Sequence, residues 1–287
     1  MPLLTGPGAA AAPAAATTAS RGALAGSASA PPAHTGAGRR GGGRFSHPLA
    51  VTNRFTPFVP GTQLRYTGQV SGEGRHDEVF TVTDLTVRVH GISVVVALDQ
   101  DYRNKKLQEA ELAFFAQDDA RNVWNLGEYP EEYENGKFAG APSTWVDRVR
   151  GAKGGFKLPA RPRRGQSWTE GQAKAIDFLD VSRVVAVRTT VRSGLGLHHG
   201  VLRVDETSPL DPTSGHQLKF YAPRLGLVRV EARGGNAQEV LSLVSRRHLG
   251  RRAMAGVDRI VRAMDRRGRT VSRDYRTLGR LHPRHRR

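Results

Sequence analysis

The sequence predicts a mainly β protein, built as a single antiparallel curved sheet or half-barrel, with a disordered N-terminal segment and a short basic C-terminal helix. Alternating apolar and polar residues recur between Phe45 and Val244, separated by Gly, Pro and Asn, which is typical of antiparallel strands. No strand–helix–strand rhythm is present, so a doubly wound nucleotide-binding fold is not expected. Of the 19 aromatic residues, 18 lie in this region, and only Tyr275 lies outside it.

The charge of the chain divides it into three parts. Its 287 residues carry a formal net charge of +18, but residues 45–245 are almost neutral. Residues 1–44 contain four arginines and no acid, and residues 246–287 contain fifteen arginines and three aspartates. We therefore expect a signal-like or disordered Ala/Gly/Pro segment at 1–44, a β-rich domain at 45–245 and an Arg-rich amphipathic tail at 246–287. Because the chain has no cysteine, we expect no disulfide, no zinc–thiolate site and no cysteine-linked lipid anchor.

Two interpretations of residues 1–44 stay open. Ala28-Ser29-Ala30 has the small-x-small form of a signal-peptide cleavage site, which favours export. No basic residue precedes Leu3-Leu4, and Gly and Pro interrupt the apolar stretch, so a flexible linker is the alternative. We expect an exported or cell-envelope-associated protein, with a cytoplasmic location as the alternative. No run of eighteen apolar residues exists, so no transmembrane segment is expected.

Individual strands are marked by alternation or by β-branched runs. The alternation changes parity between Val82 and Leu85, which predicts a bulge or bend near Asp84. The segment 107–117 contains good helix formers, but its alternation favours a strand. In chain order, the predicted strands are 63–70, 80–89, 92–98, 107–117, 123–126, 178–191, 201–207, 218–221, 228–233 and 240–244.

Several strings occur in an order known from one protein family. Phe58-Val59-Pro60-Gly61-Thr62 comes first, and Tyr221-Ala222-Pro223 with Gly226-Leu227-Val228 comes last. Over residues 55–245 this order resembles a bacterial, largely actinobacterial, family of exported β-rich proteins of unassigned activity. The Tyr-Ala-Pro-x-x-Gly-Leu-Val motif is also similar to the final strand pair of half-barrel periplasmic lipoprotein-carrier domains. The resemblance implies export and a curved sheet with an apolar concavity, and it supplies no catalytic residue.

Charged stretches in the β-rich region have plain explanations. Residues 109–134 hold eight carboxylates against Arg121, and we expect a solvated hairpin and loop there. A calcium loop is disfavoured because residues 118–122 lack alternating ligands and a central glycine, and a catalytic carboxylate pair is a further alternative. Residues 148–164 hold seven bases and no acid, and their Gly and Pro content predicts a solvated loop.

No catalytic or metal-binding motif is found. His198 and His199 are adjacent, so their rings point in opposite directions on an extended chain and do not readily share a metal ion. Ser193 does not lie in a G-x-S-x-G turn, and the chain has no H-E-x-x-H and no phosphate-binding loop. We therefore predict no enzyme activity, no cofactor and no metal site, with an uncharacterised hydrolase as the third-ranked function.

The tail carries the clearest amphipathic pattern. Val257, Ile260, Val261 and Met264 recur at helical spacing, which predicts a helix. Its flanking arginines suit anionic lipid or nucleic acid, whereas the apolar stripe could instead dock on the β-rich domain. The candidate residues for anionic-surface binding are Arg251, Arg252, Arg259, Arg262, Arg266 and Arg267.

These observations predict a non-enzymatic extracytoplasmic domain that binds an apolar ligand or a cell-envelope partner. Binding of nucleic acid or an anionic membrane through the tail is the alternative. Aromatic side chains stack on ligands, although core packing is their commoner role. The candidate ligand or rim residues are Trp124, Trp145, Trp168 and Tyr221.

Overall fold

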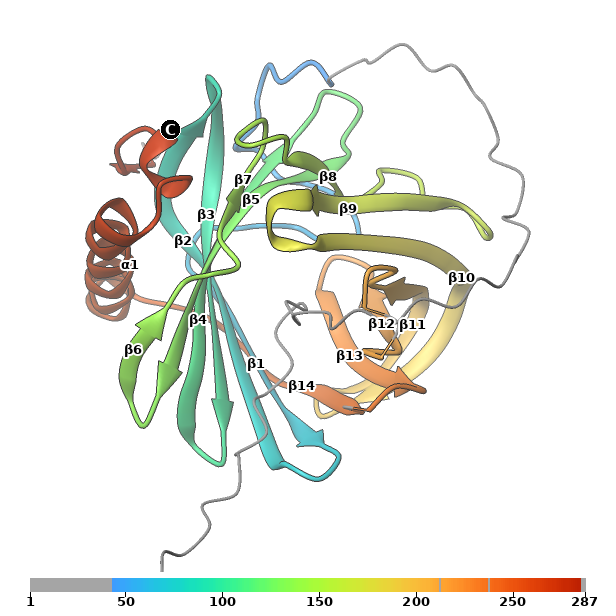
Figure 1. Ribbon diagram of the computed structural model, residues 1–287. Helices are drawn as coiled ribbons and strands as arrows, with labels where there is room; N and C mark the ends of the chain where they lie inside the picture. Colours follow the sequence, from blue (N-terminus) through green and yellow to red (C-terminus); the bar gives the residue numbers. More distant parts are fainter. Residues whose placement is uncertain (1–42, 212, 237, 285–287) are drawn as a thin grey trace, which may run out of the picture.

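The computed structural model describes residues 43–211, 213–236 and 238–284, so the predicted signal-like or disordered segment lies almost entirely outside the described residues. Antiparallel strands account for most of the described chain (Figure 1). The strands are β1 (Thr62–Val70), β2 (Gly74–Val89), β3 (Ile92–Arg103), β4 (Lys106–Gln117), β5 (Val123–Glu134), β6 (Lys137–Gly140), β7 (Trp145–Val146), β8 (Lys153–Leu158), β9 (Ser167–Ala173), β10 (Phe178–Ser193), β11 (Gly196–Thr207), β12 (His216–Ala222), β13 (Gly226–Arg233), β14 (Glu239–His248) and β15 (His282–Pro283). The helical elements are η1 (Lys174–Ile176), α1 (Arg251–Val271) and η2 (Tyr275–Thr277).

Twelve of these strands close into a barrel. The order is β1-β14-β13-β12-β11-β10-β9-β8-β5-β4-β3-β2, and β2 pairs back onto β1. β1 is paired along its length on both sides. Its pairs with β14 run from Thr62↔His248 to Val70↔Glu239, and its pairs with β2 end at Val70↔Gly74. The prediction of a single curved sheet or half-barrel is therefore wrong. Closure satisfies the edge hydrogen bonds that an open sheet would leave unpaired.

The local predictions are mostly confirmed. The register of β2 against β3 shifts between Val82 and Thr86, which confirms the predicted bulge. Residues 107–117 lie in β4, so the choice of strand over helix is also confirmed. The predicted loop at 148–164 is wrong in its middle, because Gly154 and Gly155 lie in β8. A Cβ at Gly155 would stand 2.0 Å from the Thr169 carbonyl oxygen, so glycine allows β8 and β9 to approach this closely.

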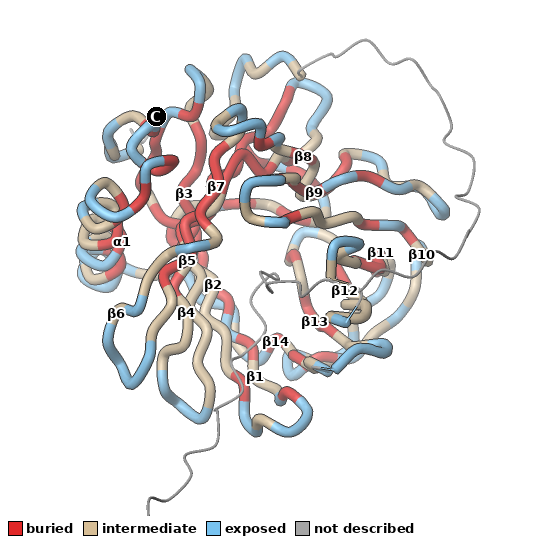
Figure 2. Tube along the Cα trace, viewed as in Figure 1, coloured by how far each residue is buried: buried red, intermediate tan, exposed pale blue. Residues whose placement is uncertain are grey.

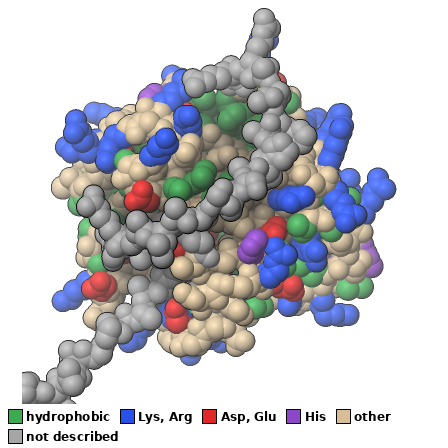
Figure 3. Space-filling view, turned by 45° about the vertical axis from the view of Figure 1, so that its right-hand side comes forward, with side chains coloured by type: hydrophobic (Ala, Val, Ile, Leu, Met, Phe, Trp, Pro, Cys, Tyr) green, Lys and Arg blue, Asp and Glu red, His purple; other side chains and the backbone are tan. Residues whose placement is uncertain are grey.

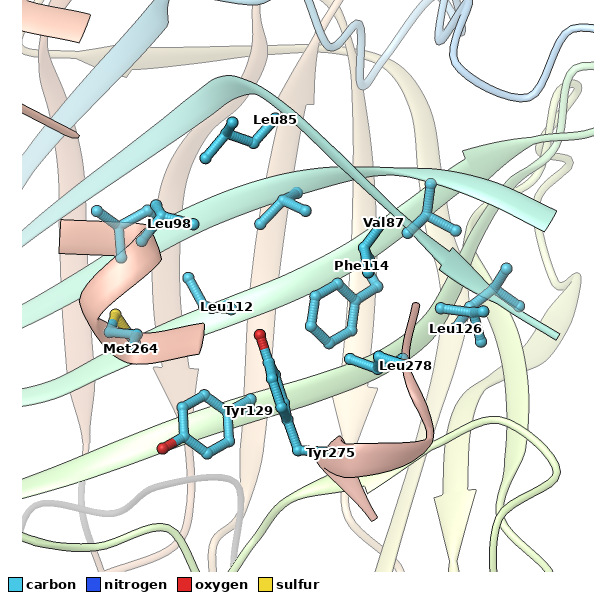
Figure 4. Packing of buried hydrophobic residues seen from close by; sticks show 14 of the residues in the cluster. Leu85, Val87, Leu98, Leu112, Phe114, Leu126, Tyr129, Met264, Tyr275 and Leu278 are labelled. Carbon is cyan, nitrogen blue, oxygen red and sulfur yellow. The ribbon is translucent and has the colours of Figure 1, made fainter. Parts of the chain in front are cut away.

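The predicted basic C-terminal helix is confirmed as α1, which lies outside the barrel against the wall formed by β2–β5 (Figure 1). Met254, Val257, Val261 and Met264 form its buried face, whereas Ile260, expected in that stripe, is 40% exposed. Figure 4 shows Met264 and Tyr275 pointing towards the strand residues beneath them. The apolar stripe of the tail is therefore used within the protein, as in the docking alternative.

Residues 43–61 cover one end of the barrel. The Asn53 side chain donates to the Pro159 carbonyl at 3.2 Å, next to the end of β8. The Arg224 backbone N–H, between β12 and β13, donates to the Arg54 carbonyl at 2.6 Å. Because these strands lie on different sides of the ring, the segment crosses the barrel end. Phe58 packs on Phe115 of β4, with 4.9 Å between the ring centroids.

Burial follows this arrangement. Buried residues concentrate in the middle of β2–β5 and along the inner face of α1, and the hairpin ends are exposed (Figure 2). Among the described residues, no helix is long and apolar enough to cross a membrane. The boundaries at 45–245 and 246–287 stay a prediction.

Candidate functional site

The inner wall of the barrel can be assigned from strand alternation. Leu98 of β3 and Leu112 of β4 pack outwards in the cluster that includes α1. Neighbouring residues in a strand point to opposite faces, so Asp99 and Glu111 point into the barrel. Asp99 lies directly opposite Glu111, and Asp101 is paired with both Glu78 of β2 and Glu109 of β4. Residues opposite one another share a face, so these five carboxylates line the same inner wall.

This wall changes from apolar to acidic along the barrel. Along the inner face of β3, Val95 and Ala97 precede Asp99. In register on β4, Phe115 and Ala113 lie beside those two apolar residues, and Glu111 lies beside Asp99. The change therefore occurs at the same level on both strands. The apolar end is the one that residues 43–61 cover, because Phe58 packs there.

Most of these carboxylates have no protein partner among the described residues. Glu78, Glu109 and Glu111 make neither an ion pair nor a hydrogen bond there, and Asp99 accepts only from the backbone N–H of Gln100. Burial, reinforced by nearby acids, raises the pKa of Asp99 to about 7 and that of Glu109 to about 8. It raises the pKa of Glu78 and Glu111 well above the ordinary value.

The acidic wall is enclosed but still reaches solvent. Glu109 and Glu111 point into the ring of strands, yet both side chains are only half-buried. A group enclosed by strands can keep accessible surface only if the space before it is not filled. We therefore interpret the acidic end of the barrel as a solvated interior.

One acidic residue of this wall has a cationic partner. His76 lies 2.6 Å from Asp101 and 2.7 Å from Glu239 of β14, and it is almost fully buried. Burial opposes protonation of the ring, but the hydrogen bonds and charges of the two carboxylates raise the pKa of His76 to about 9. A protonated His76 therefore joins β2, β3 and β14 where the barrel closes.

The opposite wall carries two lysine–glutamate pairs. Lys157 Nζ lies 2.9 Å from Glu170 Oε2, and Ser182 Oγ donates to Glu170 Oε1 at 2.5 Å. Lys219 donates to Glu206 Oε1. Burial and the Glu206 charge raise the pKa of Glu170 to about 8. Burial opposes ionisation of Glu206 as well, but the two lysine ammonium groups lower its pKa to about 2.

One buried donor on this wall lacks an acceptor among the described residues. Glu206 is 9% exposed, and its hydrogen bond with Glu170 helps to raise the pKa of Glu170 and to lower that of Glu206. Trp168 is 8% exposed and its Nε1–H has no acceptor in the described part of the chain. Ser182 lies opposite both residues in the register, so all three share the inner face. Buried polar atoms normally find partners, so the unsatisfied Trp168 donor points to a missing acceptor.

The four predicted rim aromatics occupy three environments. Trp168 and Tyr221 belong to one buried cluster on the inner wall. Trp145 is fully buried, and its indole N–H donates to Glu128 Oε2 at 2.9 Å. Trp124 packs against the outer cluster and donates to Asp118 Oδ2 at 2.9 Å. The structure thus brings only Trp168 and Tyr221 together.

The predicted arginines of the tail also differ in placement. Arg251, Arg252, Arg259 and Arg266 are exposed, and they make no ion pair with any described residue. Arg262 is half-buried. Arg267 instead reaches inwards to the fully buried carboxylate of Glu131 on β5, with Nε 2.9 Å from Oε1 and Nη2 2.5 Å from Oε2.

A serine–histidine contact occurs away from the interior. Ser193 Oγ lies 2.7 Å from His198 Nε2 in the β10–β11 hairpin. No carboxylate in the described ranges orients the other His198 nitrogen, and the Ser193 hydroxyl also accepts from the Leu195 N–H at 3.1 Å. The pair therefore closes a hairpin turn, and burial lowers the pKa of His198.

The sequence analysis did not find the interior carboxylates as a group. Glu109 and Glu111 were expected on a solvated hairpin, but they face the barrel interior. The signal was present in the alternation of β4, where acids and apolar residues take turns and therefore lie on opposite faces. The apolar face packs against an apolar cluster formed with other parts of the chain, which leaves the acids on the face towards the interior. In the described parts of the chain, no three His, Asp or Glu side chains are grouped so that they could hold a metal ion.

Comparison with known proteins gives only partial likeness. No known protein family and no curated protein matches the chain. A Bacteroides fragilis structure, described as an exported protein with a YmcC-like fold, aligns with a TM-score of 0.40 at 15% identity. A Parabacteroides distasonis structure, described as a lipoprotein, aligns with a TM-score of 0.33 at 13% identity. Each alignment covers 68% of this chain and 99% of the other. Neither description names a ligand or an activity.

Proposed function

We propose that this protein is a non-enzymatic extracytoplasmic binding protein that holds a small amphiphilic molecule inside its barrel. One observation carries the proposal: the inner wall of β2–β4 changes in register from apolar to acidic, and residues 43–61 cover its apolar end. A molecule with an apolar body and a polar head would meet matching surfaces along that wall. The extracytoplasmic location rests on the signal-like sequence Ala28-Ser29-Ala30.

The test is ligand retention by the full-length chain. We would incubate it with a host envelope lipid extract and measure its mass by native mass spectrometry, before and after denaturation. We expect an added mass that denaturation releases. A bare protein mass with this extract and with synthetic amphiphiles of ten to sixteen carbons would overturn the proposal.

Tryptophan fluorescence locates the bound molecule. Trp168 lies on the inner wall, whereas Trp124 packs on the outer side, so the two residues form a matched pair. We expect Trp168→Phe to remove most of the ligand-induced change in emission and Trp124→Phe to keep it. The opposite result would place the ligand on the outer surface and contradict the proposal.

A second candidate function is attachment to an anionic surface through α1. The observation that favours it is that Arg251, Arg252, Arg259 and Arg266 are exposed without an acidic partner among the described residues. Because the apolar stripe of α1 is buried, the contact would be electrostatic and sensitive to salt. Binding to phosphatidylglycerol vesicles that Arg259→Glu with Arg266→Glu abolishes would support this function, and unchanged binding would exclude these residues.

A further inference from the structure

We infer that the molecule held in the barrel binds through an acyl carbonyl oxygen, which accepts a hydrogen bond from the Trp168 indole N–H. This inference rests on the proposed function and names the polar group of the ligand. Trp168 lies on the inner wall and is 8% exposed, and its Nε1–H has no acceptor among the described residues. A buried donor without a partner costs free energy, so an acceptor that reaches it is bound more tightly.

The other two tryptophans of the chain show how its indole N–H groups are satisfied elsewhere. Trp124 donates to Asp118 Oδ2 and Trp145 donates to Glu128 Oε2, each at 2.9 Å. The chain has three tryptophans, so Trp168 is the exception. It is also the one that belongs to the buried cluster on the inner wall. The missing acceptor is therefore expected in the barrel interior.

The polar side chains beside Trp168 do not supply the acceptor, because they bond to one another. Both oxygens of Glu170 are bonded, one to the hydroxyl group of Ser182 and the other to a lysine. Glu206 accepts from Lys219 and forms a hydrogen bond with Glu170. The acceptor for the indole N–H must therefore come from outside the described chain.

The charge of this wall favours an acceptor without a positive charge. The hydrogen bond between Glu170 and Glu206 requires a proton on one of them, so the two side chains together carry one negative charge. They pair with two ammonium groups, those of Lys157 and Lys219. The wall around Trp168 therefore has a net positive charge, which attracts the oxygen end of a carbonyl dipole or a carboxylate and repels an ammonium group.

The acidic wall opposite is compatible with such a group near neutral pH. Burial raises the pKa of Glu109 to about 8 and that of Glu111 well above its ordinary value. Both carboxyl groups therefore hold protons at pH 7 in most molecules. A protonated carboxyl group is an O–H donor, so an acceptor in the interior suits this wall as well.

The surroundings of the indole ring are apolar, which favours an acyl group over a small inorganic anion. Leu158, Val184 and Leu202 are buried in the cluster that contains Trp168, and Phe55 of the covering segment packs against it. An inorganic anion would lose its hydration there without enough polar partners in return. A carbonyl oxygen on a hydrocarbon chain places one acceptor at the indole and apolar groups against the rest.

The test observes the indole N–H groups directly. We would record proton–nitrogen NMR spectra of the full-length protein at pH 7, alone and with methyl decanoate, decanoate or n-decylamine below their aggregation limits. We expect the ester and the acid to move the Trp168 indole signal downfield and to slow its exchange with solvent, because both supply an acceptor. We expect n-decylamine, whose ammonium group has no acceptor, to leave it in place. The signals of Trp124 and Trp145, which are already bonded, serve as internal controls.

Surface charge requires a neutral probe in this experiment. The chain carries a net charge of +18, and Lys and Arg predominate among the charged side chains on the face shown in Figure 3. Decanoate is therefore attracted to the surface without any specific site, whereas methyl decanoate is not. Equal affinity for the two probes would indicate that the natural ligand is an acyl ester. Tighter binding of decanoate that persists at high salt would indicate a free acid, and either result supports the inference.

Matched variants connect the affinity to the indole donor. Trp168→Phe keeps an aromatic ring and removes the N–H, and Trp124→Phe makes the same change on the outer side. We expect Trp168→Phe to weaken methyl decanoate binding, measured by isothermal titration calorimetry, by roughly tenfold. We expect Trp124→Phe to leave it unchanged. If Trp168→Phe fails to fold, the spectra of the unaltered chain still decide the question.

Three results would overturn the inference and leave the binding function standing. The first is a Trp168 signal that stays in place while methyl decanoate binds, and the second is tighter binding of n-decylamine than of the ester. The third is a Trp168 signal that is already downfield and protected from exchange in the protein alone, because water would then be the acceptor. Failure of all three probes to bind would instead count against the binding function itself, on which the inference depends.

Discussion

Replacing Arg267 with alanine should loosen the attachment of α1 to the barrel. Arg267 makes a bidentate ion pair with Glu131, whose carboxylate is 0% exposed and also accepts from Tyr129 Oη at 2.8 Å and Tyr133 Oη at 2.7 Å. Without the guanidinium, Glu131 keeps two hydroxyl donors but loses the only cation that pairs with it among the described residues. The variant therefore buries an uncompensated charge.

The magnitude follows from the geometry. Removing one partner of a buried ion pair costs about 3–5 kcal/mol, because the remaining charge stays desolvated. The Arg267 side chain is itself 37% exposed, which places the expected loss near the lower end of that range. For a protein of this size a loss of about 3 kcal/mol lowers Tm by roughly 6–12 °C.

The assay is urea and thermal unfolding followed by circular dichroism, with hydrogen exchange on α1 to detect local detachment. Arg266→Ala is the matched control, because Arg266 is the exposed neighbour in the same helix; it should change the free energy of unfolding by less than about 0.5 kcal/mol. The double variant Glu131→Gln with Arg267→Ala should recover part of the loss, since no charge is left buried. Equal stability of Arg267→Ala and Arg266→Ala would refute the reasoning.

Two further predictions concern barrel closure and pH. A Cβ at Gly68 would lie 1.7 Å from the Val240 carbonyl oxygen, so Gly68→Ala should disrupt the β1–β14 pairing and leave little folded protein by gel filtration. The control is Gly256→Ala in α1, where the space around the residue is open. This variant should be neutral or stabilising by up to about 1 kcal/mol. The free energy of unfolding should fall as pH rises from 5 to 9. Asp99, with a folded pKa of about 7, holds a proton that the unfolded chain has already lost, and His76, with a pKa of about 9, loses its stabilising charge in the upper half of the range. Each such proton changes stability by about 1.4 kcal/mol per pH unit, and constant or rising Tm values in buffers across this range would disprove the assignment.

The elements of the fold could be predicted because their signals are local. The valine-rich run from Ile92, the parity change near Asp84 and the alternation in residues 107–117 each lie within one strand. The missed strand β8 shows the limit of such signals. Gly154 and Gly155 are typical of a loop, and only their close approach to neighbouring backbone explains their place in a strand.

Barrel closure could not be predicted for a different reason. β1 pairs with β14, from Thr62↔His248 to Val70↔Glu239, as well as with its neighbour β2. Alternation shows that a strand has two faces, but not how many strands the ring contains or whether its ends meet. For the same reason, the acids of residues 109–134 were expected on a solvated hairpin and not inside a barrel. A carboxylate that faces outer solvent and one that faces a solvated interior give the same alternation in a strand.

Helix α1 covers the outer face of β2–β5 and makes it part of the apolar core. If this wall had only one covered face, its leucines would point into the barrel and its acids would point outwards. With α1 packed outside, Leu98 and Leu112 are buried beneath it, and Asp99 and Glu111 turn towards the interior. The tail, an Arg-rich extension in the sequence, therefore covers the outer face of this wall. The Arg267–Glu131 pair joins the tail to this same wall, so its loss should weaken both the helix attachment and any binding that depends on the carboxylates inside.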